Sequence, residues 1–390
     1  MRQTRALLVI ALLLTFTATL HPASASATTV KQVPVCKRAP HGRVGCFAVR
    51  VDRYRAGRVR HATSPVGYGP DDLHAAYALP SESAGTATVA IVDAYDDPTA
   101  EHDLAVYRAQ FHLPPCTAST GCFRKVDQHG GSALPAADGG WAQEMSLDLD
   151  MASAICPTCH LLLVEATSAS QANLGAAVNT AVRLGANAVS NSYGGPDASD
   201  RSYGRYYHHV GVAITASTGD NGYGVSYPAS SKWVTAVGGT TLTRSTRTKR
   251  GWSEAAWSGS GSGCSAMNAA TYQRSTTTLC DGRAVADIAA VADPATGVAV
   301  YDSYAFENTS GWLTFGGTSA SSPIIAAAFA LAGNTDDVTD GSYVWKHHTG
   351  GVYDVSRGST GECDTTRWCV ARRGWDGPTG WGTPHGLSSL

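Results

Sequence analysis

The sequence carries little charge for its length and lacks any long basic stretch. Only 15% of its 390 residues are charged, and 29 lysines and arginines face 31 aspartates and glutamates, for a formal net charge of −2. Proteins that bind nucleic acids usually neutralise phosphates with a basic surface, so this balance argues against a nucleic-acid partner. The sequence also has no internal repeat, which excludes collagen-like and coiled-coil arrangements. Hydrophobic residues make up 43%, enough for a large core, and this excludes a disordered chain.

Long apolar runs are scarce as well. The run Ala6–Leu14 is well short of the roughly 20 residues that a membrane-spanning helix needs. Arg2 and Arg5 precede this run and small residues at 23–27 follow it, which is the pattern of a secretory signal rather than of an anchor. We therefore expect a signal peptide at residues 1–27, no membrane association after its removal, and a secreted, monomeric protein.

Cysteines occur in an even number and in close sequential pairs. In an oxidising compartment, pairing between sequence neighbours is the simplest prediction. A Cys-x-x-Cys segment such as 156–159 also occurs in redox and zinc sites, but no second ligand pair is evident and the segment precedes a strand. A structural disulfide is therefore favoured there too. The ten cysteines give the pairs Cys36/Cys46, Cys116/Cys122, Cys156/Cys159, Cys264/Cys280 and Cys363/Cys369.

The order of apolar and amphipathic segments indicates the fold class. Residues 28–62 are rich in arginine and lack a clear apolar period, so we expect a short N-terminal extension or pro-segment there. From residue 63, short apolar strands alternate with helices, which indicates an α/β domain at 63–390 with a mostly parallel sheet and a site at the carboxyl ends of its strands. Helices are predicted at 71–77, 103–111, 144–155, 171–184 and 319–332, and strands at 86–92, 161–165, 188–192, 210–217 and 234–237.

A candidate nucleophile stands at the start of the last predicted helix. Gly316 and Gly317 allow a sharp turn, and Pro323 falls in what we expect to be the first helical turn. Ser319 would then lie in the positive field of a helix N-terminus, which suits a nucleophile, although a simple helix cap has the same composition. The segment 317–323, Gly-Thr-Ser-Ala-Ser-Ser-Pro, resembles the nucleophile motif of subtilases and sedolisins. These are serine peptidases on a related α/β fold that differ in their general base.

The base distinguishes the two groups. A subtilase would carry a histidine segment opening a helix, and the nearest candidate, His129, lies in a stretch rich in glycine, alanine and proline. Glu144 and Asp148 are four residues apart and share a helix face, where they repel unless solvated or sharing a proton. Apolar neighbours such as Met145 and Leu149 favour a packed helix over a solvated acidic face. Residues 144–150 resemble the Glu-xxx-Asp helix of sedolisins, which implies that Glu144 is the base and Asp148 orients it.

A third acid follows a predicted strand. The turn Thr218-Gly219-Asp220-Asn221-Gly222 is good turn chemistry in its own right, and it resembles the sedolisin turn that holds an oxyanion-binding aspartic acid. By that resemblance Asp220 must be protonated, because an ionised carboxylate cannot donate a hydrogen bond. Asp93 lies where a subtilase keeps its catalytic aspartate. Because Asp148 takes that role in a sedolisin, we interpret Asp93 as structural.

Two further segments resemble the sedolisin substrate cleft. Residues 190–195 resemble the segment that pairs with extended substrate, and the loop 257–265, rich in glycine and serine, resembles the segment facing it. A peptide would add there as a strand through main-chain hydrogen bonds, although ordinary loop structure is the alternative. The predicted substrate-binding residues are Ser190, Ser192, Tyr193, Gly194 and Gly261.

The C-terminal region resembles the sedolisin calcium site. One Ca²⁺ ion would be bound by two carboxylates and three backbone carbonyls, the hard oxygen ligands that calcium prefers. A glycine-rich turn with solvated aspartates is the alternative. The resemblance implies Asp354 and Asp376 as side-chain ligands, and Val355, Arg372 and Gly374 as carbonyl ligands.

Together these segments resemble the sedolisin family over residues 63–390. The resemblance implies a subtilisin-like three-layer α/β fold with a mostly parallel central sheet. It also implies a secreted serine-carboxyl endopeptidase that hydrolyses peptides or proteins through an acyl-enzyme, at acidic pH. Two alternatives stay open: a subtilase-type peptidase with a histidine base, and a non-catalytic secreted peptide-binding protein on a peptidase scaffold.

Overall fold

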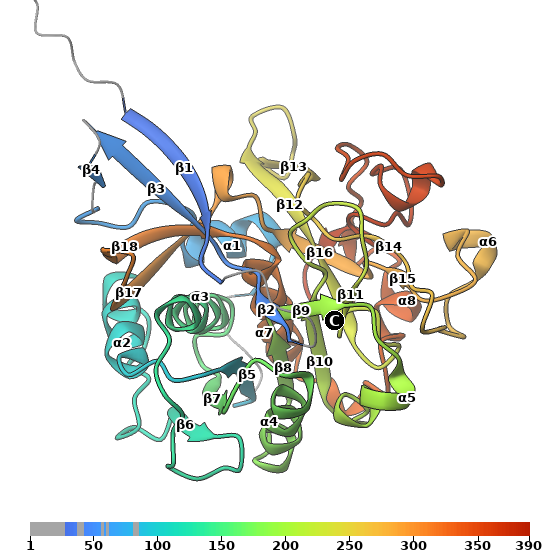
Figure 1. Ribbon diagram of the computed structural model, residues 1–390. Helices are drawn as coiled ribbons and strands as arrows, with labels where there is room; N and C mark the ends of the chain where they lie inside the picture. The colour runs from blue at the N-terminus through green and yellow to red at the C-terminus, as the bar shows by residue number, and fades with distance from the viewer. Residues whose placement is uncertain (1–27, 37–42, 56–57, 60–61, 81–85) are drawn as a thin grey trace, which may run out of the picture.

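A large, mostly parallel sheet forms the centre of the computed structural model, which describes residues 28–36, 43–55, 58–59, 62–80 and 86–390 (Figure 1). The predicted signal peptide lies outside the described residues. Neighbouring strands in this sheet run parallel, except that β12 and β13 are antiparallel. Strand β16 pairs parallel with β12 but is not part of the continuous strand order. The strand order is β13 (Trp252–Ala256), β12 (Thr235–Arg244), β10 (Ala213–Ser217), β8 (Ala188–Asn191), β5 (Thr88–Ala94), β7 (His160–Ala166) and β6 (Phe123–Asp127), with β16 at Ile288–Val291.

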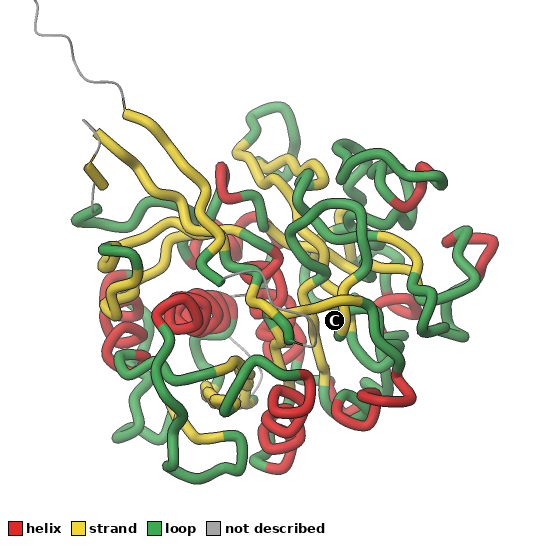
Figure 2. Tube along the Cα trace, viewed as in Figure 1, coloured by secondary structure: helices red, strands yellow, loops and turns green. Residues whose placement is uncertain are grey.

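Helices cover both faces of this sheet. Side chains alternate between the faces along β5, and all of its residues from Val89 to Ala94 are buried, as expected for a parallel strand between two layers. Helices α3 and α7 pack against each other and on the sheet, and α4 packs on β5, β7 and β8 (Figure 2). The helices are α1 (Pro70–Tyr77), α2 (Ala100–Gln110), α3 (Gly139–Ile155), α4 (Gln171–Arg183), α5 (Asp200–Tyr203), α6 (Ser275–Thr278), α7 (Thr318–Ala332) and α8 (Tyr343–His347).

A second sheet is antiparallel and takes up much of the predicted N-terminal extension. Strand β1 pairs with β3 over seven residues, from Thr28 opposite Arg55 to Pro34 opposite Val49, and β3 also pairs with β18. The order is β1 (Thr28–Pro34), β3 (Val49–Arg55), β18 (Thr309–Gly316) and β17 (Val298–Phe306), with β4 (Arg58–Val59) beside β3. The region 28–62, which showed no apolar period, thus contributes strands to the fold.

Three small sheets complete the described strands. Strands β2 (Gly45–Cys46), β9 (Tyr193–Pro196) and β11 (Ser226–Tyr227) form an antiparallel sheet in the order β11-β9-β2. Strand β14 (Gly263–Cys264) pairs with β15 (Ala284–Val285), and β19 (Val352–Tyr353) pairs with β20 (Thr383–Pro384). The first of these sheets brings the N-terminal region beside the segment predicted to bind substrate.

The predicted elements are confirmed with shifts at their ends. Helix α3 begins at Gly139 rather than at residue 144, because the Asp138 side chain caps it by accepting the N–H groups of Gly140 and Trp141. The strand predicted from Val210 begins at Ala213, since residues 210–212 form a turn that leaves Val210 exposed. The α/β class and the mostly parallel central sheet are as expected.

Disulfides form between the predicted sequence neighbours. All five pairs are bonded: Cys36–Cys46, Cys116–Cys122, Cys156–Cys159, Cys264–Cys280 and Cys363–Cys369. The Cys156–Cys159 bond closes the turn between α3 and β7. Within the described residues, no helix combines the length and the apolar character needed to cross a membrane.

Candidate active site

The predicted nucleophile, Ser319, is the second residue of α7 and is fully buried. Its Oγ donates to the carbonyl oxygen of Ser192 at 3.2 Å and accepts the backbone N–H of Phe47 at 3.1 Å. The chain enters α7 through Gly317, whose φ of 96° favours glycine. An ideal Cβ on Gly317 would lie 1.8 Å from the Phe47 carbonyl oxygen. A side chain at this position would therefore clash with the backbone of Phe47.

Pro323 does not lie where the sequence suggested. Helix α7 begins at Thr318, so Pro323 falls inside the helix and not in its first turn. A proline there has no N–H for the carbonyl four residues earlier, which belongs to Ser319. The Ser192 hydroxyl lies 3.4 Å from that carbonyl oxygen and 2.9 Å from Asp148 Oδ1, the closer acceptor for its single proton. Ser192 therefore contacts the Ser319 residue through both its carbonyl and its hydroxyl.

Glu144 and Asp148 lie buried on helix α3, which packs against α7. Burial raises the pKa of both carboxyls well above their usual range; the charge of Asp148 raises the pKa of Glu144 further, and the Ser319 hydroxyl partly offsets this. Asp148 Oδ1 accepts the Ser192 hydroxyl at 2.9 Å, and Glu144 Oε2 accepts the backbone N–H of Ala48 at 2.8 Å. The two buried carboxyls also interact with each other. Such a pair is most stable when it shares one proton, and the carboxyl without the proton can then act as a base.

Asp93 lies next to this pair. It sits near the carboxyl end of β5, fully buried, and neither of its oxygens has a hydrogen-bond partner in the described chain. Burial raises the pKa of Asp93, the charge of Glu144 raises it further, and the charge of Asp93 in turn raises that of Asp148. The sequence predicted a structural role for Asp93. In the structure, its charge also affects the pKa of Asp148, and the charge of Glu144 affects the pKa of Asp93 itself.

Asp220 lies on the loop that follows β10. Its Oδ1 accepts both the backbone N–H and the hydroxyl of Thr318 at 2.8 Å, whereas its Oδ2 is buried without a partner. Burial raises the pKa of Asp220 to about 7, so the carboxyl is protonated in acid. A proton on Oδ2 would make it a hydrogen-bond donor at the start of α7, as an oxyanion site requires.

Histidine is not part of this arrangement. In the described chain, the Ser319 hydroxyl contacts the backbone of Phe47 and Ser192, and the side-chain group that it interacts with is the carboxyl of Glu144. His129, the nearest match to a subtilase base in sequence, is exposed after β6, and its carbonyl accepts a hydrogen bond from Arg183 of α4. The groups gathered at the nucleophile are therefore carboxyls.

A cleft of about 520 Å³ runs past Asp220 and holds two of the predicted substrate-binding residues, Gly194 and Gly261. Ser192 and Tyr193 lie beside it, since Ser192 contacts Ser319 and Tyr193 pairs with Cys46. Ser190 is different: its side chain is buried beneath the site and hydrogen bonds to Ser322 at 2.9 Å. Of the five predicted residues, Gly194 and Gly261 thus line the cleft, and the other three are buried.

Four of the five predicted calcium ligands, Asp354, Arg372, Gly374 and Asp376, lie near one another in the C-terminal region. The backbone N–H of Gly374 donates to Asp354 Oδ2 at 3.1 Å, and that of Arg372 donates to Asp376 Oδ2 at 2.8 Å. Thr379 donates its N–H and its hydroxyl to Asp376 Oδ1, which leaves Oδ2 with one of its two lone pairs available. A set of two carboxylates within one loop cluster fits the ligand chemistry of Ca²⁺.

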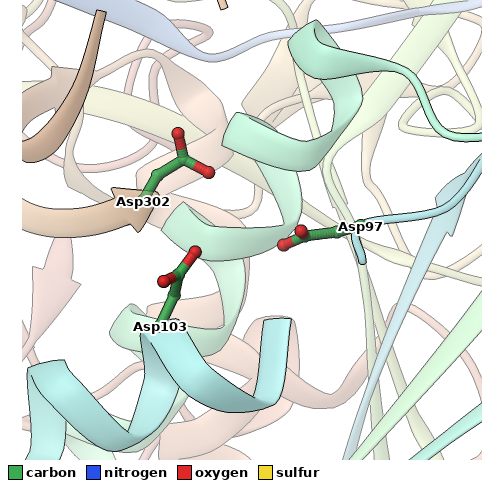
Figure 3. Close-up of side chains that lie close together, drawn as sticks. All are labelled: Asp97, Asp103 and Asp302. Atoms are coloured by element: carbon green, nitrogen blue, oxygen red, sulfur yellow. The ribbon is translucent and has the colours of Figure 1, made fainter. Parts of the chain in front are cut away.

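A separate acidic cluster was not predicted from the sequence. One carboxylate oxygen from each of Asp97, Asp103 and Asp302 lies within 4.8 Å of the others, and all three residues are buried (Figure 3). Burial raises the pKa of Asp97 to about 7 and that of Asp302 to about 8. The three residues are far apart in sequence, and only the packing of α2 against β17 brings Asp103 and Asp302 together.

The buried acids predict that stability falls as pH rises. The carboxyls of Asp97 and Asp302 titrate near pH 4 when unfolded and near 7 and 8 when folded, so the folded chain binds more protons between these limits. The free energy of unfolding should therefore decrease from pH 4 to pH 8. Asp302→Asn should reduce that decrease by about 1 to 3 kcal/mol in urea titrations, because it removes one of the two groups.

The exposed Asp281→Asn is the matched control and should leave the decrease unchanged. The measurements are made in EDTA, so that bound cations do not contribute. A wild-type protein that is as stable at pH 8 as at pH 4 would contradict the proton-bound state of this cluster.

Comparisons with known proteins identify the family of this chain. Residues 137–349 match the model of the subtilase family. The chain is 29% identical over 369 residues to kumamolisin from Bacillus sp. (strain MN-32), an alignment that covers 84% of this chain and 64% of kumamolisin. The chain thus spans less than two thirds of that relative.

Solved structures give the same grouping. A Pseudomonas sedolisin, described as a serine-carboxyl proteinase and complexed with pseudo-iodotyrostatin, superposes with a TM-score of 0.69 at 25% identity, over 83% of this chain and 96% of that chain. Fervidolysin from Fervidobacterium pennivorans, a keratinolytic enzyme related to subtilisin, shares the fold with a TM-score of 0.51 at 16% identity, over 87% of this chain and 52% of its own. The matched family model shows that this chain belongs to the subtilase family in its broad sense, and within that family the chain is similar to kumamolisin and to the Pseudomonas sedolisin.

Proposed function

We propose that this chain is a serine-carboxyl endopeptidase. The observation that carries the proposal is the meeting of Ser319 with the buried pair Glu144 and Asp148 on one side and with Asp220 on the other. A nucleophile, a base with its orienting group and an oxyanion donor are the parts that acyl transfer needs. The similarity to kumamolisin and to the Pseudomonas sedolisin supports the same assignment.

In the proposed reaction, Ser319 Oγ attacks the carbonyl carbon of the peptide while Glu144 accepts its proton. Asp148 holds Glu144 in place, and the protonated Asp220 donates to the oxyanion. Glu144 then gives the proton to the leaving nitrogen, and the C–N bond breaks to leave an ester on Ser319. Water hydrolyses the ester with Glu144 again acting as the base.

Acidic pH suits this arrangement. Asp220 donates only when protonated, and its pKa of about 7 means that the donor is lost as the pH rises through neutrality. Glu144 can act as the base while the Glu144–Asp148 pair holds a single proton, because Asp148 can carry that proton. We therefore propose an optimum below neutral pH.

The two alternatives of the sequence analysis have less support. A histidine base would have to reach Ser319, and His129 lies instead against α4. A non-catalytic peptide-binding protein would not need a buried base or an unpartnered acid beside the serine, and both are present. The described site is thus better suited to catalysis than to binding alone.

We further propose peptide or protein substrates, a monomeric state and secretion after removal of residues 1–27. The five disulfides support an oxidising compartment. In this proposal residues 28–62 act as a short pro-segment and residues 63–390 form the peptidase domain, although both parts contribute strands to one antiparallel sheet.

A calcium ion is proposed at Asp354 and Asp376, with the carbonyls of Val355, Arg372 and Gly374. Its chemistry would be structural, because it would draw the two segments together through shared oxygen ligands. An excess of Ca²⁺ over EDTA should raise the melting temperature by about 3 °C, if the free ion is present at 100 times the Kd of the folded state. Differential scanning calorimetry at fixed pH measures this shift.

The shift should disappear in Asp376→Ala and persist in Asp302→Asn, whose carboxylate belongs to the other acidic cluster. Equal melting temperatures of the wild-type chain in Ca²⁺ and in EDTA would refute the calcium site.

The proposed activity is tested by digestion of an unfolded, carboxymethylated protein at pH 4. Wild type should cleave it, and Ser319→Ala should not. Ser321→Ala is the matched control, since Ser321 is a buried serine on the same helix whose hydroxyl contacts the carbonyls of Ala290 and Val291. Equal rates for wild type and Ser319→Ala would exclude the proposed nucleophile.

A further inference from the structure

The cleft of this chain is lined in part by its own N-terminal region, which includes Cys46, Phe47 and Ala48. Strand β2 adds antiparallel to β9, with Gly45 opposite Gly194 and Cys46 opposite Tyr193 (Figure 1). The pairing continues through the N–H of Phe47, which donates to the Ser192 carbonyl at 3.3 Å. This is the main-chain pattern by which an extended peptide adds to a strand edge.

The peptide bond between Phe47 and Ala48 lies at the proposed catalytic groups. The N–H before this bond, on Phe47, lies 3.1 Å from Ser319 Oγ, and the N–H within it, on Ala48, lies 2.8 Å from Glu144 Oε2. The carbonyl oxygen of Phe47 and Asp220 Oδ2 lie 1.8 Å and 2.6 Å from one point, the ideal Cβ position on Gly317. Nucleophile, base and oxyanion donor thus surround a single peptide unit.

The Phe47 ring lies against two glycines, Gly194 and Gly219, which have no side chains to fill the space around it. An ideal Cβ on Gly194 would lie 2.8 Å from two carbons of the Phe47 ring, and one on Gly219 would lie 3.5 Å from the ring. A side chain at Gly194 would therefore occupy the space of the ring. Both glycines line the cleft of about 520 Å³, as does Ser226. The resulting space accepts a flat aromatic ring.

We propose that Phe47–Ala48 is the bond that Ser319 cleaves in its own chain, and that the space around the Phe47 ring selects aromatic residues before the cleaved bond. This inference rests on the proposed peptidase function. Ser319 Oγ bonds to the Phe47 carbonyl carbon, and its proton passes through Glu144 to the Ala48 nitrogen as the C–N bond breaks. One water then hydrolyses the Phe47 ester, which yields a carboxylate on Phe47 and a free amino group on Ala48.

The segments on both sides of this bond are held independently of it. On the amino-terminal side, Cys46 is bonded to Cys36 and paired with β9, and β1 pairs with β3. On the carboxyl-terminal side, Arg50 is buried and donates to Gln143, next to Glu144, at 2.8 Å. The described residues 28–36 and 43–47 therefore stay bound at the cleft after the cut, and their later dissociation produces a lag before other substrates are cleaved.

Intact mass and amino-terminal sequencing after incubation at pH 4 test the assignment. Wild type should give a new terminus at Ala48, and Ser319→Ala should keep the bond intact. Phe47→Tyr should be cut at a rate within a few-fold of wild type, whereas Phe47→Asp should be cut at least 10-fold more slowly, because a charged side chain replaces the ring between the two glycines. Phe47 is only partly buried, and the melting temperature of each variant verifies its fold.

A second measurement uses two peptides that differ only in having Phe or Asp before the bond to be cleaved. The Phe peptide should show a kcat/KM at least 10-fold higher. A wild-type chain that digests unfolded protein while its 47–48 bond stays intact overturns this inference and leaves the proposed function standing. A chain that cleaves neither itself nor other substrates overturns both, and equal kcat/KM for the two peptides overturns the aromatic pocket.

Discussion

Glu144→Gln is expected to lower kcat for peptide hydrolysis about 1,000-fold at pH 4, within the range that a positioned general base contributes. Glutamine keeps the shape of the side chain and can still accept the N–H that Ala48 donates to Glu144, but it cannot take a proton from Ser319. Because the loss arises in the chemical step, KM should change little. Initial rates on a peptide with Phe before the cleaved bond measure both constants.

Asp150→Asn is the control for this experiment. Asp150 is a buried acid on the same helix, and its Oδ2 accepts the N–H of Tyr301 on β17, away from the nucleophile. Its replacement should leave kcat within a few-fold of wild type. If Glu144→Gln retained more than a tenth of the wild-type kcat, the base would have to be another group.

Replacement of Asp220 should have the second large effect on activity, and it should also change the pH dependence of the reaction. Asp220→Ala should lower kcat about 100- to 1,000-fold, the usual cost of one oxyanion donor. Asp220→Asn should retain more activity, because its amide can donate from the position of Oδ2 while its carbonyl oxygen accepts from Thr318 at the position of Oδ1. Activity that depends on Asp220 should fall above pH 7, since ionisation removes the donor.

The pH profile of Asp220→Asn separates this role from a structural one. An amide does not titrate, so the decline at high pH should move upward relative to wild type. A profile with the wild-type decline near pH 7 would show that a different group controls it. Alanine should lower the rate without restoring activity at higher pH, and a melting curve shows whether either variant has lost its fold.

Much of the fold could be predicted because its signals are local. Buried parallel strands such as β5 appear as short apolar runs, and helices such as α7 as runs of small apolar residues after glycine. The disulfides follow from sequence neighbours in close pairs. The ends of elements were less predictable, because a cap such as Asp138 extends α3 well before its apolar face becomes recognisable.

The site could be predicted where one motif contains the whole chemical unit. Local spacing placed Glu144 and Asp148 on one helix face and Ser319 after the turn at Gly317, and the resemblance to sedolisins implied their roles. Proximity between distant segments gives no such signal. The cluster of Asp97, Asp103 and Asp302 depends on tertiary packing.

The N-terminal region was the most difficult part to interpret. Its arginines and its lack of an apolar period suggested a short extension or pro-segment, yet Arg50 is buried, where it pairs with Asp52 at 2.7 Å and with Gln143. The pairing of β2 with β9 depends on residues about 150 positions apart and uses backbone atoms, which no side-chain pattern records. The closely spaced Cys36 and Cys46 were the one local sign of order there.

The central claim is that carboxyls, and no histidine, carry out the chemistry at Ser319. The most direct test is the cleavage of an unfolded protein from pH 3 to pH 9 by wild type, Glu144→Ala and His129→Ala. The account predicts activity in acid that declines through pH 7, is lost in Glu144→Ala and is retained in His129→Ala. Activity at pH 8 that survives Glu144→Ala and disappears in His129→Ala would contradict it.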